Sequence, residues 1–175
     1  MTEERKAAVT LKGNPITLFG PELKVGEKAP DFTCDQGLGP TISLSDMGDK
    51  VKVFNVLLSI ATPVCQTQTR KFNEELGNID SELEAYIVSV DLPMSHKTFC
   101  GTEGIEAIKG LSDYKNNSFG SAYGVLMSEH KVLCRAVFVI DKDNIIQHVE
   151  YVSEIAEEPD YDAALNVIKL SLIHI

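Results

Sequence analysis

Residues 51–73 read VKVFNVLLSIATPVCQTQTRKFN and are the most informative part of the chain. The first eight of them, Val51 to Leu58, form a nearly continuous apolar run, which is typical of a β-strand buried on both faces. From Pro63 onward the apolar residues recur at helical spacing between charged ones, at positions 65, 72, 76 and 79. This stretch therefore predicts a buried strand that leads through a short turn into an amphipathic helix.

Other parts of the chain repeat this pattern. Ala85 to Val90 and Ala136 to Ile140 are short runs rich in Val and Ile, and we expect both to be buried strands. Asp143-Asn144 marks a hairpin that leads into a further strand at Ile145–Val152. Near the end, apolar residues at offsets of 3, 4, 7 and 11 from Tyr161 predict a second amphipathic helix.

The first residues indicate an extension. Residues 8–19 alternate apolar and polar side chains around Gly13-Asn14-Pro15, which predicts an N-terminal β-hairpin. The remaining order is strand, helix, strand, helical stretch, two strands and helix. This order predicts an α/β protein with a thioredoxin-like fold, in which helices flank a central mixed sheet. No internal repeat or linker interrupts it, so we expect residues 1–175 to form a single domain.

Composition excludes several classes of function. With 175 residues, of which 43% are hydrophobic, the chain is long enough to bury a core without metal or disulfide support. Its net charge of −10 repels nucleic-acid phosphates and anionic lipid. It has no stretch of about 18 apolar residues that could span a membrane, and no apolar leader follows the charged first residues. We therefore expect a cytoplasmic protein that binds neither nucleic acid nor membrane.

Four cysteines remain to be explained: Cys34, Cys65, Cys100 and Cys134. Their gaps of 31, 35 and 34 residues exclude a C-x-x-C redox motif and a zinc knuckle. The four histidines also lack metal-ligand spacing, and no phosphate-binding glycine motif is present. We therefore expect no metal and no cofactor. Widely spaced cysteines in a reducing compartment are either inert or catalytic.

Cys65 has the local sequence of a reactive cysteine. Thr62 is a good helix N-cap and Pro63 suits the first helical position, so Cys65 falls in the first turn. The unpaired N–H groups and the helix dipole favour a thiolate there. The helical spacing also turns Cys65 toward the core, where a thiolate needs a permanent cation such as an arginine. On these residues alone, an inert core cysteine remains an equal alternative.

Five segments, in order along the chain, resemble the bacterial thiol peroxidases, the atypical two-cysteine subfamily of the peroxiredoxins. The most specific is Ser59 to Asn73, which is similar to the active-site segment of that family. The segment from Asp91 to Gly104, containing FCGTEG, resembles the segment that carries the resolving cysteine. The other three are AYGV at 122–125, RAVFVID at 135–141 and EPDYDAAL at 158–165.

The resemblance implies a role for each site residue. Cys65 matches the peroxidatic cysteine, and Thr62 the threonine that orients the peroxide and contacts the thiolate. Pro63 matches the proline that lines the substrate pocket and shields the sulfur. Arg135 matches the arginine that stabilises the thiolate and polarises the O–O bond. Cys100 matches the resolving cysteine, which forms an intramolecular disulfide with Cys65.

The implied activity is the reduction of hydrogen peroxide and alkyl hydroperoxides, with thioredoxin as the reductant and a homodimer as the assembly. Two rival functions stay open on the sequence: a noncatalytic peroxide sensor or redox relay on the same scaffold, and a cysteine hydrolase with a histidine base. Ala61 stands where many family members have Asp, which affects fine tuning rather than the reaction class. We interpret Cys34 and Cys134 as inert thiols.

Overall fold

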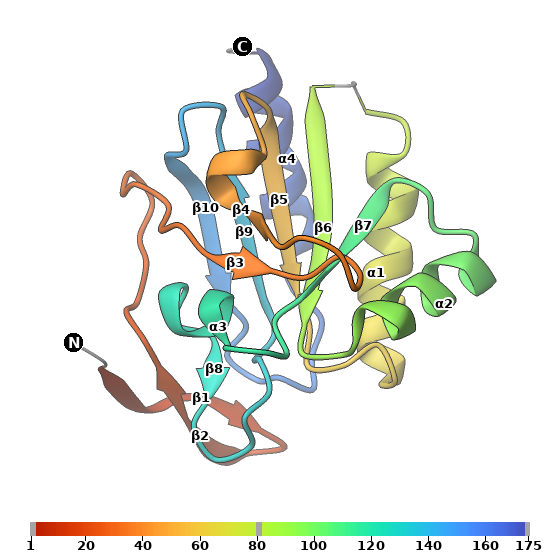
Figure 1. Cartoon of the computed structure of the whole chain (residues 1–175). Coiled ribbons are helices and arrows are strands. Elements are labelled where there is room, and N and C mark those ends of the chain that lie inside the picture. Colours follow the sequence, from red (N-terminus) through yellow and green to blue (C-terminus); the bar gives the residue numbers. More distant parts are fainter. Residues whose placement is uncertain (1–2, 80–81, 174–175) are drawn as a thin grey trace.

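The computed structural model describes residues 3–79 and 82–173, and a five-stranded mixed sheet forms its centre (Figure 1). The strand order is β10-β9-β5-β6-β7. Strands β5, β6 and β7 run parallel, whereas β9 is antiparallel to both of its neighbours. The bounds are β5 Val51–Val56, β6 Leu83–Ser89, β7 Ile108–Ser112, β9 Ala136–Ile140 and β10 Ile146–Tyr151. The predicted central mixed sheet is thus confirmed.

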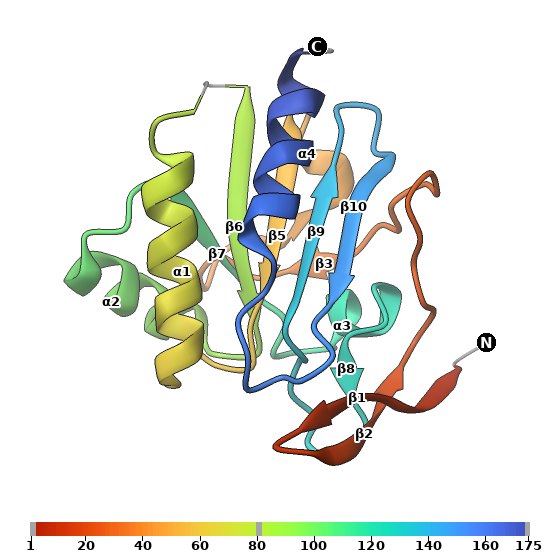
Figure 2. The same cartoon turned by 180° about the vertical axis from the view of Figure 1, so that it is seen from behind.

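Helices cover the sheet on both faces. Helices α1 (Pro63–Leu76) and α4 (Tyr161–Ile173) lie side by side on one face, as Figure 2 shows. The short α3 (Ser118–Ala122) covers the other face (Figure 1). Helix α2 (Pro93–Glu103) packs against β7 at one end of the strand order. Since β5 lies in the middle of the sheet, all six of its residues are buried.

Two hydrophobic clusters follow from the alternation along the strands. Val51 and Val53 pack with α1, α2 and α4 in one cluster, and this cluster also contains Cys65. Phe54 and Val56 belong to the other cluster, on the opposite face. That second cluster includes a group of aromatic rings, in which Phe119 and Tyr123 stack with centroids 4.2 Å apart. The active-site candidate therefore lies on the face that α1 and α4 cover.

The N-terminal hairpin consists of β1 (Glu4–Leu11) and β2 (Asn14–Phe19). Strand β1 starts four residues before the predicted position, because Arg5 anchors it by donating hydrogen bonds to the carbonyl groups of Gly20 and Gly124. Strand β2 pairs on its other edge with the short β8 (Leu126–Met127). Residues 20–50, between β2 and β5, contain two two-residue strands and one 3-10 turn: β3 Thr33–Cys34, β4 Ile42–Ser43 and η1 Leu44–Asp46.

Six elements were absent from the sequence-based prediction: β7, β8 and α3, and the short β3, β4 and η1. Strand β7 lies at an edge, and its sequence IKGLS has a lysine and a glycine in the middle, which hides the apolar pattern. Helix α1 ends at Leu76 instead of continuing to Ile79, because Gly77 follows it. Within the described residues, no helix is long and apolar enough to cross a membrane.

Candidate active site

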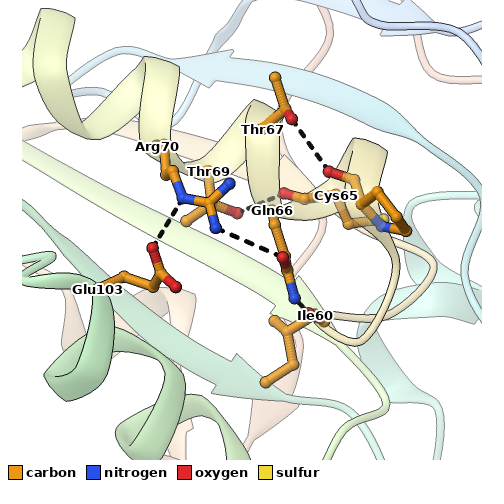
Figure 3. Close-up of polar contacts among 8 residues, drawn as sticks. Ile60, Cys65, Gln66, Thr67, Thr69, Arg70 and Glu103 are labelled. Atoms are coloured by element: carbon orange, nitrogen blue, oxygen red, sulfur yellow. Dashed lines mark hydrogen bonds and ion pairs between the residues drawn. The ribbon is translucent and has the colours of Figure 1, made fainter.

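The first turn of α1 has the geometry that the sequence predicts. Thr62 is the N-cap, with extended backbone angles, and Pro63 opens the helix. Two side-chain hydrogen bonds support the turn, as Figure 3 shows. The side-chain Nε2 of Gln66 donates to the Ile60 carbonyl at 2.9 Å, and the Thr69 hydroxyl donates to the Cys65 carbonyl at 2.8 Å. Cys65 therefore lies in a well-formed helical turn.

The sulfur of Cys65 is buried against a charged side chain. Arg135 Nη1 donates to Cys65 Sγ at 3.3 Å, and the two residues are 2% and 0% exposed. Arg135 immediately precedes β9, and its side chain points to the α1 face, whereas Cys134 packs in the cluster on the opposite face. An arginine remains charged when buried, so this contact places a permanent positive charge beside the Cys65 sulfur.

The other partners of the Arg135 guanidinium are neutral oxygens. Nη1 also donates to Gln68 Oε1 at 2.6 Å, and Nε donates to the carbonyl of Ile155 at 2.8 Å. Gln68 in turn donates to Asn55 Oδ1 on β5. Carbonyl oxygens satisfy the guanidinium without cancelling its charge, and the Cys65 sulfur is its third partner.

The sequence analysis did not identify Gln68 and Asn55 as site residues, although each is a polar residue at a position that the pattern predicts to be buried. Gln68 stands three residues after Cys65 and is fully buried, so it is a polar residue on the buried side of the helix. Asn55 is a polar residue inside an otherwise apolar strand. A buried polar group needs a partner, and two such groups on adjacent elements indicate a hydrogen-bonded network.

Thr62 and Pro63, which precede Cys65, are half-buried and exposed respectively. The Thr62 hydroxyl donates to the Ser59 carbonyl at 3.1 Å. Pro63 is exposed and lines a cavity of about 370 Å³, together with Val64 and Thr67 of the same helix. The opposite wall consists of Ala156, Glu157 and Glu158, directly after the Ile155 carbonyl that binds Arg135. This cavity therefore opens beside the first turn of α1.

Cys100 is separated from Cys65. It lies on α2, half-buried, and lines a cavity of about 340 Å³ with His96 and with Ile108 of β7. Two strands stand between β7 and β9, which places these strands about 14 Å apart. All four cysteines are free thiols. Burial raises the pKa of Cys100, so the folded helix keeps this thiol protonated.

Cys34 and Cys134 are shielded thiols. Cys134 is fully buried, and burial raises its pKa to about 12. Burial and the adjacent Asp113, whose Oδ1 lies 3.7 Å from the sulfur, raise the pKa of Cys34 further still. Thiols react as thiolates, so neither sulfur is reactive near neutral pH.

Alkylation of the native, reduced protein at pH 7 should therefore modify Cys65 first and leave Cys34 and Cys134 unmodified. The check is a time course with iodoacetamide, followed by digestion and mass spectrometry of each cysteine peptide. Full labelling of all four cysteines in denaturant is the control. Modification of Cys34 or Cys134 as fast as Cys65 in the folded protein would contradict this account of the four thiols.

Metal and histidine chemistry find no support at Cys65. Among residues 3–79 and 82–173, no group of three or more His, Cys, Asp or Glu side chains is placed to hold a metal ion. His96 is buried and its Nε2 lies 2.7 Å from the Ser89 hydroxyl, so it is occupied elsewhere. The partner of the Cys65 sulfur is an arginine, which cannot act as a general base near pH 7.

Comparison with known proteins agrees with this site. The Redoxin family model matches residues 24–165. A thiol peroxidase of Halalkalibacterium halodurans is 49% identical over 95% of this chain and 99% of its own length, and one of Bacillus subtilis is 42% identical over 93% and 97%. The crystal structure of a peroxiredoxin-like protein from Aquifex aeolicus, 39% identical, has a TM-score of 0.86 and covers 95% of this chain and 98% of its own. The chain therefore belongs to the Redoxin family and, within it, to the thiol peroxidases.

Proposed function

We propose that this protein is a thiol-dependent peroxidase that reduces hydrogen peroxide and alkyl hydroperoxides through a sulfenic acid at Cys65. The observation that carries the proposal is the buried contact of 3.3 Å between Arg135 Nη1 and Cys65 Sγ at the start of a helix. A permanent cation and a helix N-terminus together favour a nucleophilic thiolate. Membership of the thiol peroxidases supports the same reaction.

In the first step the Cys65 thiolate attacks the terminal oxygen of the peroxide. An S–O bond forms, the O–O bond breaks, and the departing oxygen takes up a proton and leaves as water or an alcohol. The sulfur is oxidised to a sulfenic acid and the peroxide is reduced. Arg135 stabilises the negative charge, which moves from sulfur to the departing oxygen. The cavity behind Pro63 is the proposed entry, and the Thr62 hydroxyl is within the same turn to orient the peroxide.

In the second step Cys100 captures the sulfenic acid. The Cys100 thiol gives up its proton and its sulfur attacks the Cys65 sulfur; an S–S bond forms, the S–O bond breaks, and the sulfenic oxygen takes up a proton and leaves as water. Cys65 and Cys100 are free thiols on two different helices, so we infer that the first turn of α1 and part of α2 unwind to bring the two sulfurs together. Gly101 and Gly104 supply backbone freedom at the end of α2.

A dithiol reductant then restores both thiols and is itself oxidised to a disulfide. Thioredoxin is the reductant we propose, and the bacterial cytoplasm, where disulfides are kept reduced, is the proposed compartment. A homodimer is the proposed assembly. Leu92 and Met94 are exposed apolar side chains, and Met94 lines a cavity together with Ile60, so a second copy of the chain would cover them.

The test is a coupled assay with thioredoxin, its reductase and NADPH. Addition of hydrogen peroxide or an alkyl hydroperoxide should start NADPH consumption that depends on the protein, on the peroxide and on thioredoxin. Each component is omitted in turn as a control. If the protein is oxidised at Cys65 but consumes no NADPH with any dithiol reductant, the noncatalytic sensor is the better description.

Replacing Arg135 with alanine should lower the second-order rate constant for peroxide by about 100-fold, because the change removes both the counter-ion and one donor to the developing charge. Alkylation of the variant at pH 7 should slow as well, since less of Cys65 is thiolate. Stopped-flow kinetics and iodoacetamide labelling measure the two effects.

Arg70→Ala is the matched control for that substitution. Arg70 lies on the same helix as Cys65, but it is exposed and forms an ion pair with Glu103. This control should keep its peroxide rate within about twofold of the original protein, because exposed ion pairs contribute little. Equal rates in Arg135→Ala and the unmodified protein would remove Arg135 from the mechanism.

A further inference from the structure

A single carboxylate joins the turn before Cys65 to the start of the helix that carries Cys100. Asp91 lies between β6 and α2, and its side chain accepts hydrogen bonds from the Ser59 hydroxyl at 2.8 Å and from the Ile60 N–H at 2.9 Å. It accepts a third from the Ser89 hydroxyl at 2.6 Å. Ser59 and Ile60 lead directly into the N-cap of α1, so Asp91 fixes the position from which that helix starts.

Hydrogen-bond counting extends this connection to His96. The Ser89 hydroxyl has one proton, which it donates to Asp91, and its oxygen lies 2.7 Å from His96 Nε2. Nε2 must then carry a proton and donate it to Ser89. Burial lowers the pKa of His96 to about 4, so the ring is neutral near pH 7. The result is a directed chain of hydrogen bonds from His96 to Ser89 and from Ser89 to Asp91 Oδ2. The Ile60 N–H donates to the same Oδ2, and the Ser59 hydroxyl donates to Oδ1.

His96 is held firmly within the fold. It is 2% exposed, and its ring lies so close to Gly110 of β7 that a side chain at position 110 would overlap it. His96 also stands one helical turn before Cys100, and both line the same cavity. If the helix around Cys100 unwinds, His96 at one end of the chain of hydrogen bonds is therefore displaced as well.

We propose that His96, Ser89 and Asp91 are positioning residues that make the unwinding of the two cysteine segments a single, coupled event. This inference rests on the proposed disulfide between Cys65 and Cys100. While the chain of hydrogen bonds is intact, the turn at Ser59–Ile60 and the helix α2 hold each other in the folded form. When α2 unwinds, Asp91 loses its support from Ser89 and His96, and the turn before Cys65 loosens with it.

The coupling sets how long the sulfenic acid persists before Cys100 captures it. If unwinding limits disulfide formation, a weaker connection speeds that step and leaves the reaction with peroxide unchanged. The second connection between the two helices is the exposed ion pair of Arg70 with Glu103, at 2.8 Å. Exposed pairs stabilise little, so of these two polar connections we assign the coupling to the partly buried chain of hydrogen bonds, which acts beside the apolar packing of Phe99 against α1.

The first experiment measures hydrogen exchange of the reduced protein and needs no peroxide. Ser59→Ala changes one end of the chain of hydrogen bonds, and His96→Leu changes the other end. We expect Ser59→Ala to accelerate amide exchange about fivefold or more in the peptide covering 93–103, and His96→Leu to do the same at 59–62. Ser95→Ala is the matched control, since its exposed hydroxyl makes no hydrogen bond within the described part of the chain.

If these residues only stabilise their own segments, a different pattern of amide exchange is expected. Each substitution would then accelerate exchange only in the segment that contains it, and that outcome overturns the coupling. If His96→Leu does not fold, Ser59→Ala alone still decides the question, because its effect is measured in a helix that it does not belong to.

The second experiment separates the two chemical steps by stopped flow. In His96→Leu the conversion of sulfenic acid to disulfide should be about 5 to 10 times faster, whereas the rate with peroxide should change by less than about twofold. Ser95→Ala should match the unmodified protein in both steps. An unchanged rate of disulfide formation overturns the proposal. Failure of the unmodified protein to form any Cys65–Cys100 disulfide would instead refute the proposed function. The hydrogen-exchange result, measured on the reduced protein, does not depend on that disulfide.

Discussion

Replacing Cys65 with serine abolishes peroxide turnover, by a factor of at least about 10⁴. A serine hydroxyl beside Arg135 stays protonated near pH 7, whereas a cysteine there supplies a thiolate, and oxygen cannot form the sulfenic acid on which the cycle depends. The coupled NADPH assay measures the loss. The substitution removes little volume from a buried site, so circular dichroism should show a folded protein.

Cys34→Ser is the matched control for this loss. Cys34 is also a buried cysteine, but it lies beside Asp113 in the cluster on the opposite face of the sheet. This variant should keep more than about half of the activity, because its sulfur takes no part in the cycle. If Cys65→Ser keeps measurable thioredoxin-linked turnover and Cys34→Ser loses it, the nucleophile has been assigned to the wrong cysteine.

The position of Cys65 could be predicted because its determinants are local. A buried strand, an N-cap threonine, a proline at the first helical position and an apolar stripe are all contained in residues 51–76. The structure has a strand at Val51–Val56 and a helix at Pro63–Leu76, with Thr62 as the N-cap. Local propensity and burial agree in this region, which is the condition under which a sequence pattern determines structure.

Other features depend on contacts between distant residues. The partners of Arg135 are Gln68 on α1 and the carbonyl of Ile155, and no pattern in the sequence indicates that these groups meet. Alternation along the strand shows only that Arg135 and Cys134 face opposite sides. The resemblance to the thiol peroxidases assigned Arg135 its role, and the structure adds how the charge is held. Asp91 was likewise not recognised, because its three donors come from two separate segments.

Replacing Cys100 with serine stops the cycle after one turnover. The first step needs no second cysteine, so the variant should consume about one equivalent of peroxide per chain at the normal rate. Without a second thiol the sulfenic acid cannot become a disulfide, and thioredoxin has no substrate to reduce. Cys100 is half-buried on α2 and contributes little to the core, so serine should leave the fold intact.

Two measurements distinguish this outcome from a general loss of activity. A dimedone-type reagent should trap a sulfenic acid at Cys65 in Cys100→Ser, and excess peroxide should carry the same sulfur on to sulfinic acid. Cys34→Ser, treated in the same way, should form the disulfide and turn over continuously. Steady NADPH consumption by Cys100→Ser would contradict the resolving role. The sulfenic acid would then be reduced directly by an external thiol, and the unwinding of α2 would no longer be needed for catalysis.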